Sequence, residues 1–144
     1  MKLGPSLHLS WDELGCHDGT PYPVDWRETR AVDLAQEFER IRGIVGGPIP
    51  IDSAYRTEAY NVRVGGVKNS QHCQGRALDL RPPIGMPLDL FYDAIREYAD
   101  SPGSKIWGLG RYPIFVHIDI RPEPDNHRLV VWRGSRAWAE TKSA

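Results

Sequence analysis

The sequence predicts an α+β domain, with a small antiparallel sheet and helices packed mainly on one face of it. Three observations lead to this fold class. Two segments have the apolar spacing of amphipathic helices, three closely spaced runs after residue 105 have the character of strands, and Pro and Gly residues separate these segments. Helices followed by a run of strands are typical of α+β proteins with antiparallel sheets.

The first amphipathic segment repeats apolar residues at intervals of four, three and four: Leu34, Phe38, Ile41 and Val45. Residues 25–28 fit a capping box before it, and the Gly-Gly-Pro sequence at 46–48 ends it. The second segment forms an apolar face from Leu88, Phe91, Ala94, Ile95 and Tyr98. Thr57 is a suitable N-cap for a shorter helix.

Five short runs are expected to form strands, at residues 49–53, 77–80, 106–109, 114–120 and 129–132. The segment from residue 69 to residue 75 is expected to be a loop that leads into the second of them. The first stretch of the chain, to about residue 24, is rich in turn-forming residues and is expected to be irregular.

The chain has 144 residues and a mass of 16.3 kDa, so residues 1–144 are expected to form a single domain. Its 18 Lys and Arg residues are balanced by 19 Asp and Glu residues, which gives a formal net charge of -1. Because phosphate binding needs a surplus of basic residues, this balance argues against a nucleic-acid-binding protein.

Cys16 and Cys73 are the two cysteines of the chain. Two cysteines make neither a disulfide scaffold nor a four-cysteine zinc site, so both are expected to be reduced thiols. The N-terminal residues include no apolar stretch of signal-peptide length, and no run approaches the ~18 apolar residues of a membrane span. We therefore expect a protein that is synthesised in the cytoplasm, does not insert into a membrane and acts as a monomer.

His72, Asp79 and His117 stand out as candidate metal ligands. Two imidazoles and one carboxylate are the ligand set of many catalytic zinc sites, which keep a fourth position for water. In the strand expected at 114–120, alternation places His117 and Asp119 on one face. Taken alone, such alternation fits a solvent-facing strand as well as a site.

A set of short segments then occurs in a characteristic order: 53–57 (SAYRT), 60–61 (YN), 65–72 (GGVKNSQH), 75–80 (GRALDL) and 116–119 (VHID). These segments resemble the zinc D,D-peptidase family, which includes D-Ala-D-Ala carboxypeptidases, murein endopeptidases and phage endolysins, and whose fold is shared by Hedgehog signalling domains. The pattern S-x-H-x-x-G-x-A-x-D, followed by a late His on a strand, carries the resemblance, which covers roughly residues 27–133.

The resemblance implies a role for each matching residue. His72, Asp79 and His117 correspond to the zinc ligands of the family, with Zn²⁺ at the sheet. Arg56 corresponds to an arginine that faces the substrate and can stabilise an anionic carbonyl oxygen or a substrate carboxylate. A guanidinium suits this task because it is always charged and offers a planar set of donors.

The chain departs from the family pattern at the general base. Many relatives carry a Glu three positions before the last His ligand, or a second His beside it, whereas Ile114 and Phe115 stand here. Asp119 is the nearest acidic residue on the correct face of the strand. Two roles are open for it: accepting the proton of the attacking water, or hydrogen-bonding a ligand imidazole and fixing its tautomer.

Other residues near these motifs have simpler interpretations. Ser70 is expected to bond within the loop that presents His72, and Gly75 to permit a tight backbone there. Trp132 and Trp138 are expected to pack in the core or at an edge. Tyr112 and Pro113 fit a cleft wall and a turn equally well.

The resemblance favours a zinc peptidase that hydrolyses peptidoglycan stem or cross-bridge peptides. A phage endolysin that is released to the cell wall is one biological setting for this function. One alternative is a non-catalytic, metal-stabilised module that binds the cell wall or belongs to a phage particle. A less favoured alternative is a non-haem iron oxygenase, in which His117 and Asp119 would be joined by His127.

Overall fold

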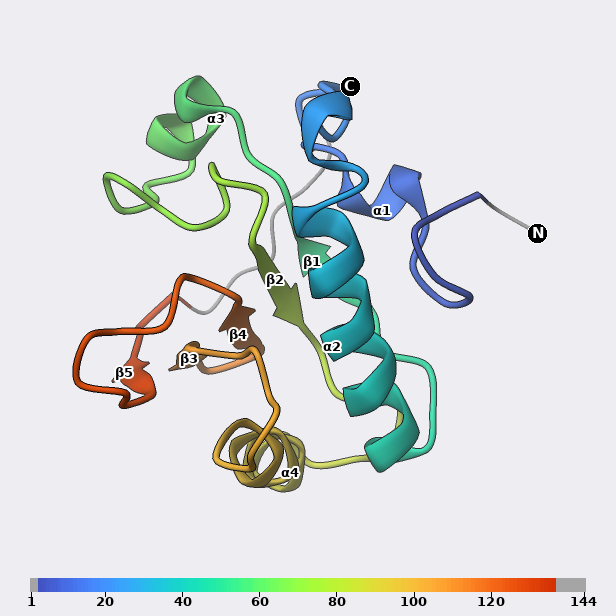
Figure 1. Cartoon of the computed structure of the whole chain (residues 1–144), viewed down its shortest axis with the longest axis vertical. Helices are drawn as coiled ribbons and strands as arrows, with labels where there is room; N and C mark the ends of the chain where they lie inside the picture. Colours follow the sequence, from blue (N-terminus) through green and yellow to red (C-terminus); the bar gives the residue numbers. More distant parts are fainter. Residues whose placement is uncertain (1–2, 137–144) are drawn as a thin grey trace.

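A computed structural model of the chain describes residues 3–136, and Figure 1 shows how its elements are arranged. In chain order the elements are α1 (Trp11–Leu14), a 3₁₀ turn (Val24–Trp26), α2 (Arg30–Val45), β1 (Ile51–Ser53), α3 (Glu58–Arg63), β2 (Ala77–Leu80), α4 (Leu88–Ala99), β3 (Gly108–Arg111), β4 (Val116–Asp119) and β5 (Val130–Arg133). The α+β fold class is confirmed.

The five strands form one sheet in the order β1-β2-β4-β3-β5. Three of the four pairings are antiparallel, as expected, whereas β5 pairs parallel to β3. The reason is topological. Both edges of β4 are already paired with β2 and β3, so the chain that leaves β4 crosses β3 and joins its outer edge in the same direction as β3.

One face of the sheet belongs to the hydrophobic core. Alternation on β2 and β4 points four apolar side chains to this face: Leu78, Leu80, Val116 and Ile118. They share a core cluster with Phe38 of α2 and with Phe91 and Ile95 of α4. Each such side chain contributes roughly 1.5–3 kcal/mol when fully buried. Figure 1 shows α2 alongside the sheet and α4 end-on below it.

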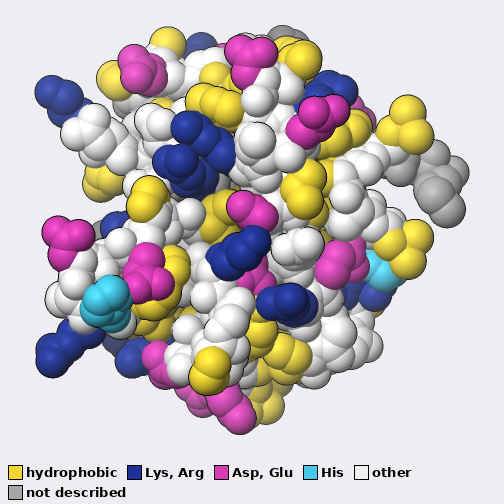
Figure 2. Space-filling view, viewed as in Figure 1, with side chains coloured by type: hydrophobic (Ala, Val, Ile, Leu, Met, Phe, Trp, Pro, Cys, Tyr) yellow, Lys and Arg dark blue, Asp and Glu magenta, His cyan; other side chains and the backbone are white. Residues whose placement is uncertain are grey.

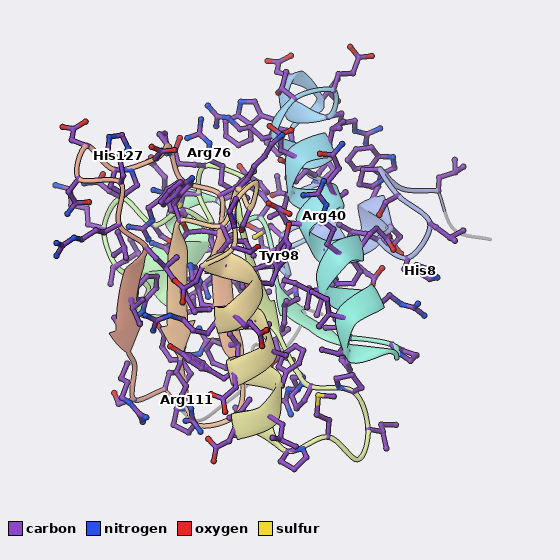
Figure 3. All side chains as sticks on the ribbon, turned by 60° about the horizontal axis from the view of Figure 1, so that its bottom comes forward. His8, Arg40, Arg76, Tyr98, Arg111 and His127 are labelled. Carbon is purple, nitrogen blue, oxygen red and sulfur yellow. The ribbon has the colours of Figure 1, made fainter. Side chains whose placement is uncertain are left out.

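A buried carboxylate joins the two long helices. Glu37 of α2 accepts hydrogen bonds from the hydroxyl group of Tyr98 on α4 and from the backbone N–H of Lys105. Arg40 donates to the same hydroxyl group over 3.1 Å, and Figure 3 shows the two side chains meeting between the helices. Hydrogen bonds between the two helices thus supplement the apolar packing of α2 against α4.

The helix α2 begins later than the sequence suggests, so the prediction of a capping box at residues 25–28 is wrong. Residues Val24–Trp26 form a 3₁₀ turn, and α2 starts at Arg30 without a side-chain cap. The ring of Trp26 packs edge-on against Tyr22 and Tyr55, and this aromatic packing holds the segment in its tighter turn.

A capping box does occur further upstream, within the segment expected to be irregular. Ser10 accepts a hydrogen bond from the backbone N–H of Glu13, whose carboxylate accepts one from the backbone N–H of Ser10. These bonds start the short helix α1, which buries Leu14. The N-cap expected at Thr57 is confirmed, because its hydroxyl oxygen accepts from the N–H of Tyr60 over 3.1 Å.

The surface carries charges of both signs. On the face shown in Figure 2, basic and acidic side chains are interspersed with apolar ones. One surface pair, Lys105 and Asp33, joins the start of α2 to the segment after α4 over 2.8 Å. Cys16 and Cys73 are both free thiols, as expected. Within residues 3–136, no helix has the length and apolar character needed to cross a membrane.

Candidate metal centre and cleft

The face of the sheet that points away from the core carries the candidate metal ligands. Asp79 on β2 lies directly opposite His117 on β4, and Ala77 lies opposite Asp119. Residues that are directly opposite in an antiparallel pair share a face and have neighbouring side chains. Strand pairing therefore brings together residues that are 38 positions apart in the chain.

His72 reaches this face from the loop between α3 and β2. Its backbone N–H donates to the hydroxyl oxygen of Ser70 over 3.2 Å, which confirms the expected role of Ser70. The carbonyl oxygen of His72 accepts from the N–H of Arg56 over 3.1 Å and from that of Gly75 over 3.2 Å. Gly75 has a positive φ of 66°, so the tight backbone expected there is confirmed.

The three candidate ligands converge on one point. Nε2 of His72 lies 3.1 Å from Oδ1 of Asp79, and Nδ1 of His117 lies 3.0 Å from the same oxygen. One donor atom from each residue lies within 4.8 Å of the other two, and all three side chains are buried. Two nitrogen donors and one oxygen donor with this spacing fit a zinc ion.

The outer nitrogens of the two rings support this assignment. Nδ1 of His72 donates to the carbonyl oxygen of Ala54 over 2.6 Å, and Nε2 of His117 lies 2.8 Å from Oδ2 of Asp119. When the outer nitrogen of an imidazole carries the proton, the lone pair of the inner nitrogen is available to a metal. Both rings therefore present their acceptor atoms to the common centre.

Electrostatics in the cluster favour a cation. Burial lowers the pKa of His72 and keeps its ring neutral. Burial would also lower the pKa of His117, but hydrogen bonds to Asp119 and Asp79 outweigh it and raise the pKa to about 9. Burial would raise the pKa of Asp79, yet the two imidazoles hold it well below its usual range. A positive charge, supplied by a proton or a metal, is thus stabilised between the two carboxylates.

Asp119 is fully buried behind His117. Arg121 donates to both of its oxygens, from Nε over 2.7 Å and from Nη2 over 2.8 Å. Burial works to raise the pKa of Asp119, but these bonds and the bond from His117 lower it well below the usual range. Both oxygens are engaged, and the carboxylate stays ionised at neutral pH.

Arg56 follows β1 and borders the cluster. Its Nη2 atom lies 3.6 Å from Oδ2 of Asp79, and its Nη1 atom donates to Oδ1 of Asn61 over 3.1 Å. Asn61 in turn donates to the carbonyl oxygen of Val67 over 2.8 Å. Sequence analysis assigned no role to Asn61, which links the guanidinium to the loop after α3.

The candidate metal centre lies in a cleft of about 480 Å³ that is open to solvent. The cleft is lined by Arg56, Gly65, Gly66, Val67, Asn69, Ser70, Gln71, His72, Asp79, Tyr112, Phe115, His117, Arg121, Trp132, Ser135 and Arg136. Arg121, Trp132 and Arg136 are lining residues that sequence reasoning missed, and Tyr112 proves to be part of the cleft wall. Trp138 lies outside the described residues.

Trp132 forms the wall next to His117. The two ring centroids are 5.1 Å apart, and the indole Nε1 donates to the hydroxyl oxygen of Tyr112 over 3.0 Å. Gly110 lies between Trp132 and His117 in the register of the sheet. A Cβ atom at Gly110 would lie 2.7 Å from the indole ring, so glycine is required for this approach. Gly110 within its strand is the sequence signal by which this wall could have been found.

The iron-oxygenase alternative is not supported by the positions of its residues. His127 is exposed, in a turn after β4, and bonds Glu123. Within residues 3–136, the one group of three or more metal-binding side chains is His72, Asp79 and His117. His127 therefore does not join His117 and Asp119.

An α+β domain with two imidazoles and a carboxylate at the floor of an open cleft has the features of a metal-dependent hydrolase. The model of the family described as Peptidase M15 matches residues 7–119. The chain therefore belongs to the peptidase M15 family and is a metallopeptidase, which confirms the resemblance found in the sequence. The match contains Arg56 and the three residues of the centre, and no curated protein matches the chain.

Proposed function

We propose that this protein is a zinc-dependent peptidase that hydrolyses the stem or cross-bridge peptides of peptidoglycan. The observation that carries the proposal is the convergence of His72, Asp79 and His117 at the floor of the cleft in a member of this family. When bound there, zinc supplies a Lewis acid that polarises a carbonyl group and lowers the pKa of water.

Asp119 acts in this proposal through His117 rather than on the substrate. Its Oδ2 atom accepts a hydrogen bond from Nε2–H of His117, which keeps Nδ1 directed at the candidate metal centre. A carboxylate whose pKa is held well below its usual range is a weak proton acceptor at neutral pH. Of the two roles left open by the sequence, the supporting one therefore agrees better with its bonds.

Arg56 stabilises negative charge that develops on the scissile carbonyl oxygen. Its guanidinium borders the cleft beside Asp79 and is held there by Asn61, so little reorganisation is needed when the charge appears. Removal of one such preorganised donor typically lowers kcat by about 10²–10³.

The test combines metal analysis with mass spectrometry of purified muropeptides after digestion. We expect His72→Ala to lose bound zinc and cleavage products together, because Asp79 and His117 alone make an incomplete ligand set. His127→Ala is the matched control, since His127 is exposed and outside the cluster. Cleavage retained by His72→Ala would overturn the ligand assignment. The masses of the products identify the scissile bond and separate carboxypeptidase from endopeptidase activity.

A second candidate is a wall-binding module without catalysis. It is favoured by the scarcity of acidic groups, since Asp79 is the one carboxylate among the described residues that line the cleft. Zinc-loaded protein that sediments with purified cell walls but releases no peptide would establish this alternative. The endolysin setting remains a prediction, tested by whether added protein lyses permeabilised cells.

A further inference from the structure

Ser53, the last residue of β1, has a buried hydroxyl group that forms no hydrogen bond. Its side chain belongs to the buried polar residues, with a relative exposure of 1%. Within residues 3–136, its Oγ atom has no hydrogen-bond partner. Such a group costs free energy, because it has given up its bonds to water and gained none in the protein. The position of Ser53 in the sheet indicates which acceptor is nearest to it.

The pairing of β1 with β2 places Ser53 next to Asp79. The two residues lie directly opposite each other in the antiparallel register, and Figure 1 shows the two strands side by side. Directly opposite residues share a face of the sheet, and their Cβ atoms are typically about 4.5–5.5 Å apart. Because Asp79 belongs to the candidate metal centre, Ser53 lies on the same face as that centre.

A β-bulge in β1 is responsible for this placement. Two steps along β1, from Ile51 to Ser53, oppose a single step along β2. In a regular strand both residues would point to the same face, whereas Ile51 here packs against the hydrophobic core. The extra residue, Asp52, is fixed by Arg81, whose Nε atom donates to both of its oxygens over 3.0 and 2.8 Å. Bulges redirect side chains in this way and are common next to active sites.

The residues that follow Ser53 contact other parts of the candidate centre. The carbonyl oxygen of Ala54 accepts from Nδ1 of His72 over 2.6 Å. The backbone N–H of Arg56 donates to the carbonyl oxygen of His72 over 3.1 Å. The segment 53–56 therefore holds His72 at its ring and at its backbone, and it begins with a hydroxyl group beside Asp79.

The Asp79 carboxylate needs a hydrogen-bond donor in the zinc-loaded protein. Its Oδ1 atom lies 3.1 Å from Nε2 of His72 and 3.0 Å from Nδ1 of His117. When the lone pairs of these nitrogens are directed at an ion, neither nitrogen donates to the carboxylate. Its Oδ2 atom lies 3.6 Å from Nη2 of Arg56, which is too long for a hydrogen bond. Carboxylates that bind a metal are themselves usually hydrogen-bonded by a neighbouring group.

We propose that Ser53 is a positioning residue, whose hydroxyl group donates a hydrogen bond to Asp79 and fixes that carboxylate as a metal ligand. This inference rests on the metal centre of the proposed function and adds a supporting residue to it. A serine hydroxyl group rotates to direct its proton at an acceptor. Ser53 acts through Asp79 and not on the substrate, since it is not among the described residues that line the cleft.

The first test compares the zinc affinities of Ser53→Thr and Ser53→Val. Both side chains are β-branched and nearly equal in shape, so the comparison isolates the hydroxyl group. We expect Ser53→Val to bind zinc about tenfold more weakly than Ser53→Thr, as for other residues that support a metal ligand. Ser53→Ala, which adds no volume, should bind zinc about tenfold more weakly than the native protein. Competition with a chromogenic chelator measures the affinities. Equal affinities of the Thr and Val variants, or native affinity of Ser53→Ala, would overturn the proposal.

Urea denaturation with and without zinc separates this role from simple packing. In the metal-free protein the hydroxyl group has no partner, so Ser53→Ala should unfold at the native urea concentration or above it. In the same excess of zinc, Ser53→Ala should unfold at a lower urea concentration than the native protein, because its zinc binding is weaker. A metal-free Ser53→Ala that is clearly less stable than the native protein would overturn the proposal, since the hydroxyl group would then be bonded without a metal.

Ser10→Ala is the matched control, because Ser10 is a second buried serine whose hydroxyl group bonds Glu13 at the start of α1. It should lower the stability with and without zinc and keep the native zinc affinity. If the native protein binds zinc and cleaves no muropeptide, the peptidase proposal fails, and Ser53 is still judged from the affinities. If the native protein binds no zinc, both proposals fail. If Ser53→Ala binds zinc and cleaves as the native protein does, the role of Ser53 alone fails.

Discussion

The carboxylate of Asp119 lies 2.8 Å from Nε2 of His117, while Nδ1 of the same ring faces Asp79. His117 is therefore held from both of its nitrogens. The contact with Asp119 is made inside the protein, where Arg121 neutralises the carboxylate from the other side. This arrangement fixes the orientation of a candidate metal ligand.

Asp119→Asn tests this orientation. We expect zinc affinity to fall about 10- to 100-fold, because the charged acceptor on His117 is lost, with cleavage partly restored by excess zinc. Zinc affinity is measured by competition with a chromogenic chelator. Asp125→Asn, at an exposed position in a turn, should bind zinc as the native protein does. Full zinc binding with no cleavage at saturating metal would instead assign the proton-accepting role to Asp119.

Gly108→Ala tests whether the Asp119 carboxylate occupies the space that a side chain at position 108 would fill. A Cβ atom at Gly108 would lie 2.1 Å from Oδ2 of Asp119, whose position is fixed by Arg121 and His117. The clash should lower the free energy of unfolding by about 1–3 kcal/mol and weaken zinc binding with it. Urea denaturation and chelator competition measure the two effects.

The control for this substitution has the opposite expected sign. Gly43 is an exposed position within α2, and a Cβ atom there would meet nothing within 4 Å. Gly43→Ala should raise the free energy of unfolding by about 0.5–1 kcal/mol and leave zinc binding unchanged. A similar response of both variants would show that Gly108 is not required by Asp119.

The hydrogen bonds of Asp18 predict a specific pH dependence of the free energy of unfolding. The backbone N–H of Thr20 donates to Oδ1 and the hydroxyl group of Thr57 to Oδ2, and these bonds lower the pKa of Asp18 to about 2. A folded-state pKa below the unfolded value of 3.8 stabilises the protein above pH ~4, and this contribution is lost as the pH falls through 2. Screening at this partly exposed position limits it to less than about 1 kcal/mol.

The measurement is a titration of the Asp18 carboxyl carbon by NMR, together with urea denaturation at pH 6 and pH 2.5. Asp18→Asn should differ less from the native protein at pH 2.5 than at pH 6, because part of the contribution of the ionised carboxylate is already lost at the lower pH. Asp93→Asn, at an exposed position on α4, should show no such difference at either pH. An ordinary titration of Asp18 near pH 4 would contradict the bonding to Thr20 and Thr57.

Sequence patterns predicted the parts of the fold that are set by interactions between residues close together in the chain. The strand at 77–80 has the bounds expected, because apolar alternation begins after a loop and two prolines end it. The helix α1 was not expected, since four residues are too few for periodicity and only Ser10 and Glu13 mark it. The parallel position of β5 follows from which strand edges remain open, which no local pattern records.

The candidate site also contains residues that a local motif marks and residues whose positions depend on distant segments of the chain. The candidate ligands His72, Asp79 and His117 belong to sequence motifs, and the structure brings all three together. Arg121 and Trp132 were missed because their positions depend on the register of β3, β4 and β5. Register is fixed by contacts between distant segments, so the support of a metal ligand is harder to predict than the ligand itself.

Glu37 should stabilise the domain without affecting the cleft, because its carboxylate joins α2 to α4 on the core side of the sheet. Glu37→Ala leaves the Tyr98 hydroxyl group and the Lys105 N–H without their acceptor, so the free energy of unfolding should fall by about 2–4 kcal/mol. Tyr98→Phe removes one of the two bonds and should cost about 1 kcal/mol. Urea denaturation measures both variants, and Glu97→Ala, at an exposed position on α4, should stay within about 0.5 kcal/mol of the native protein. A native-like value for Glu37→Ala would show that water replaces the carboxylate and that apolar packing alone joins the helices.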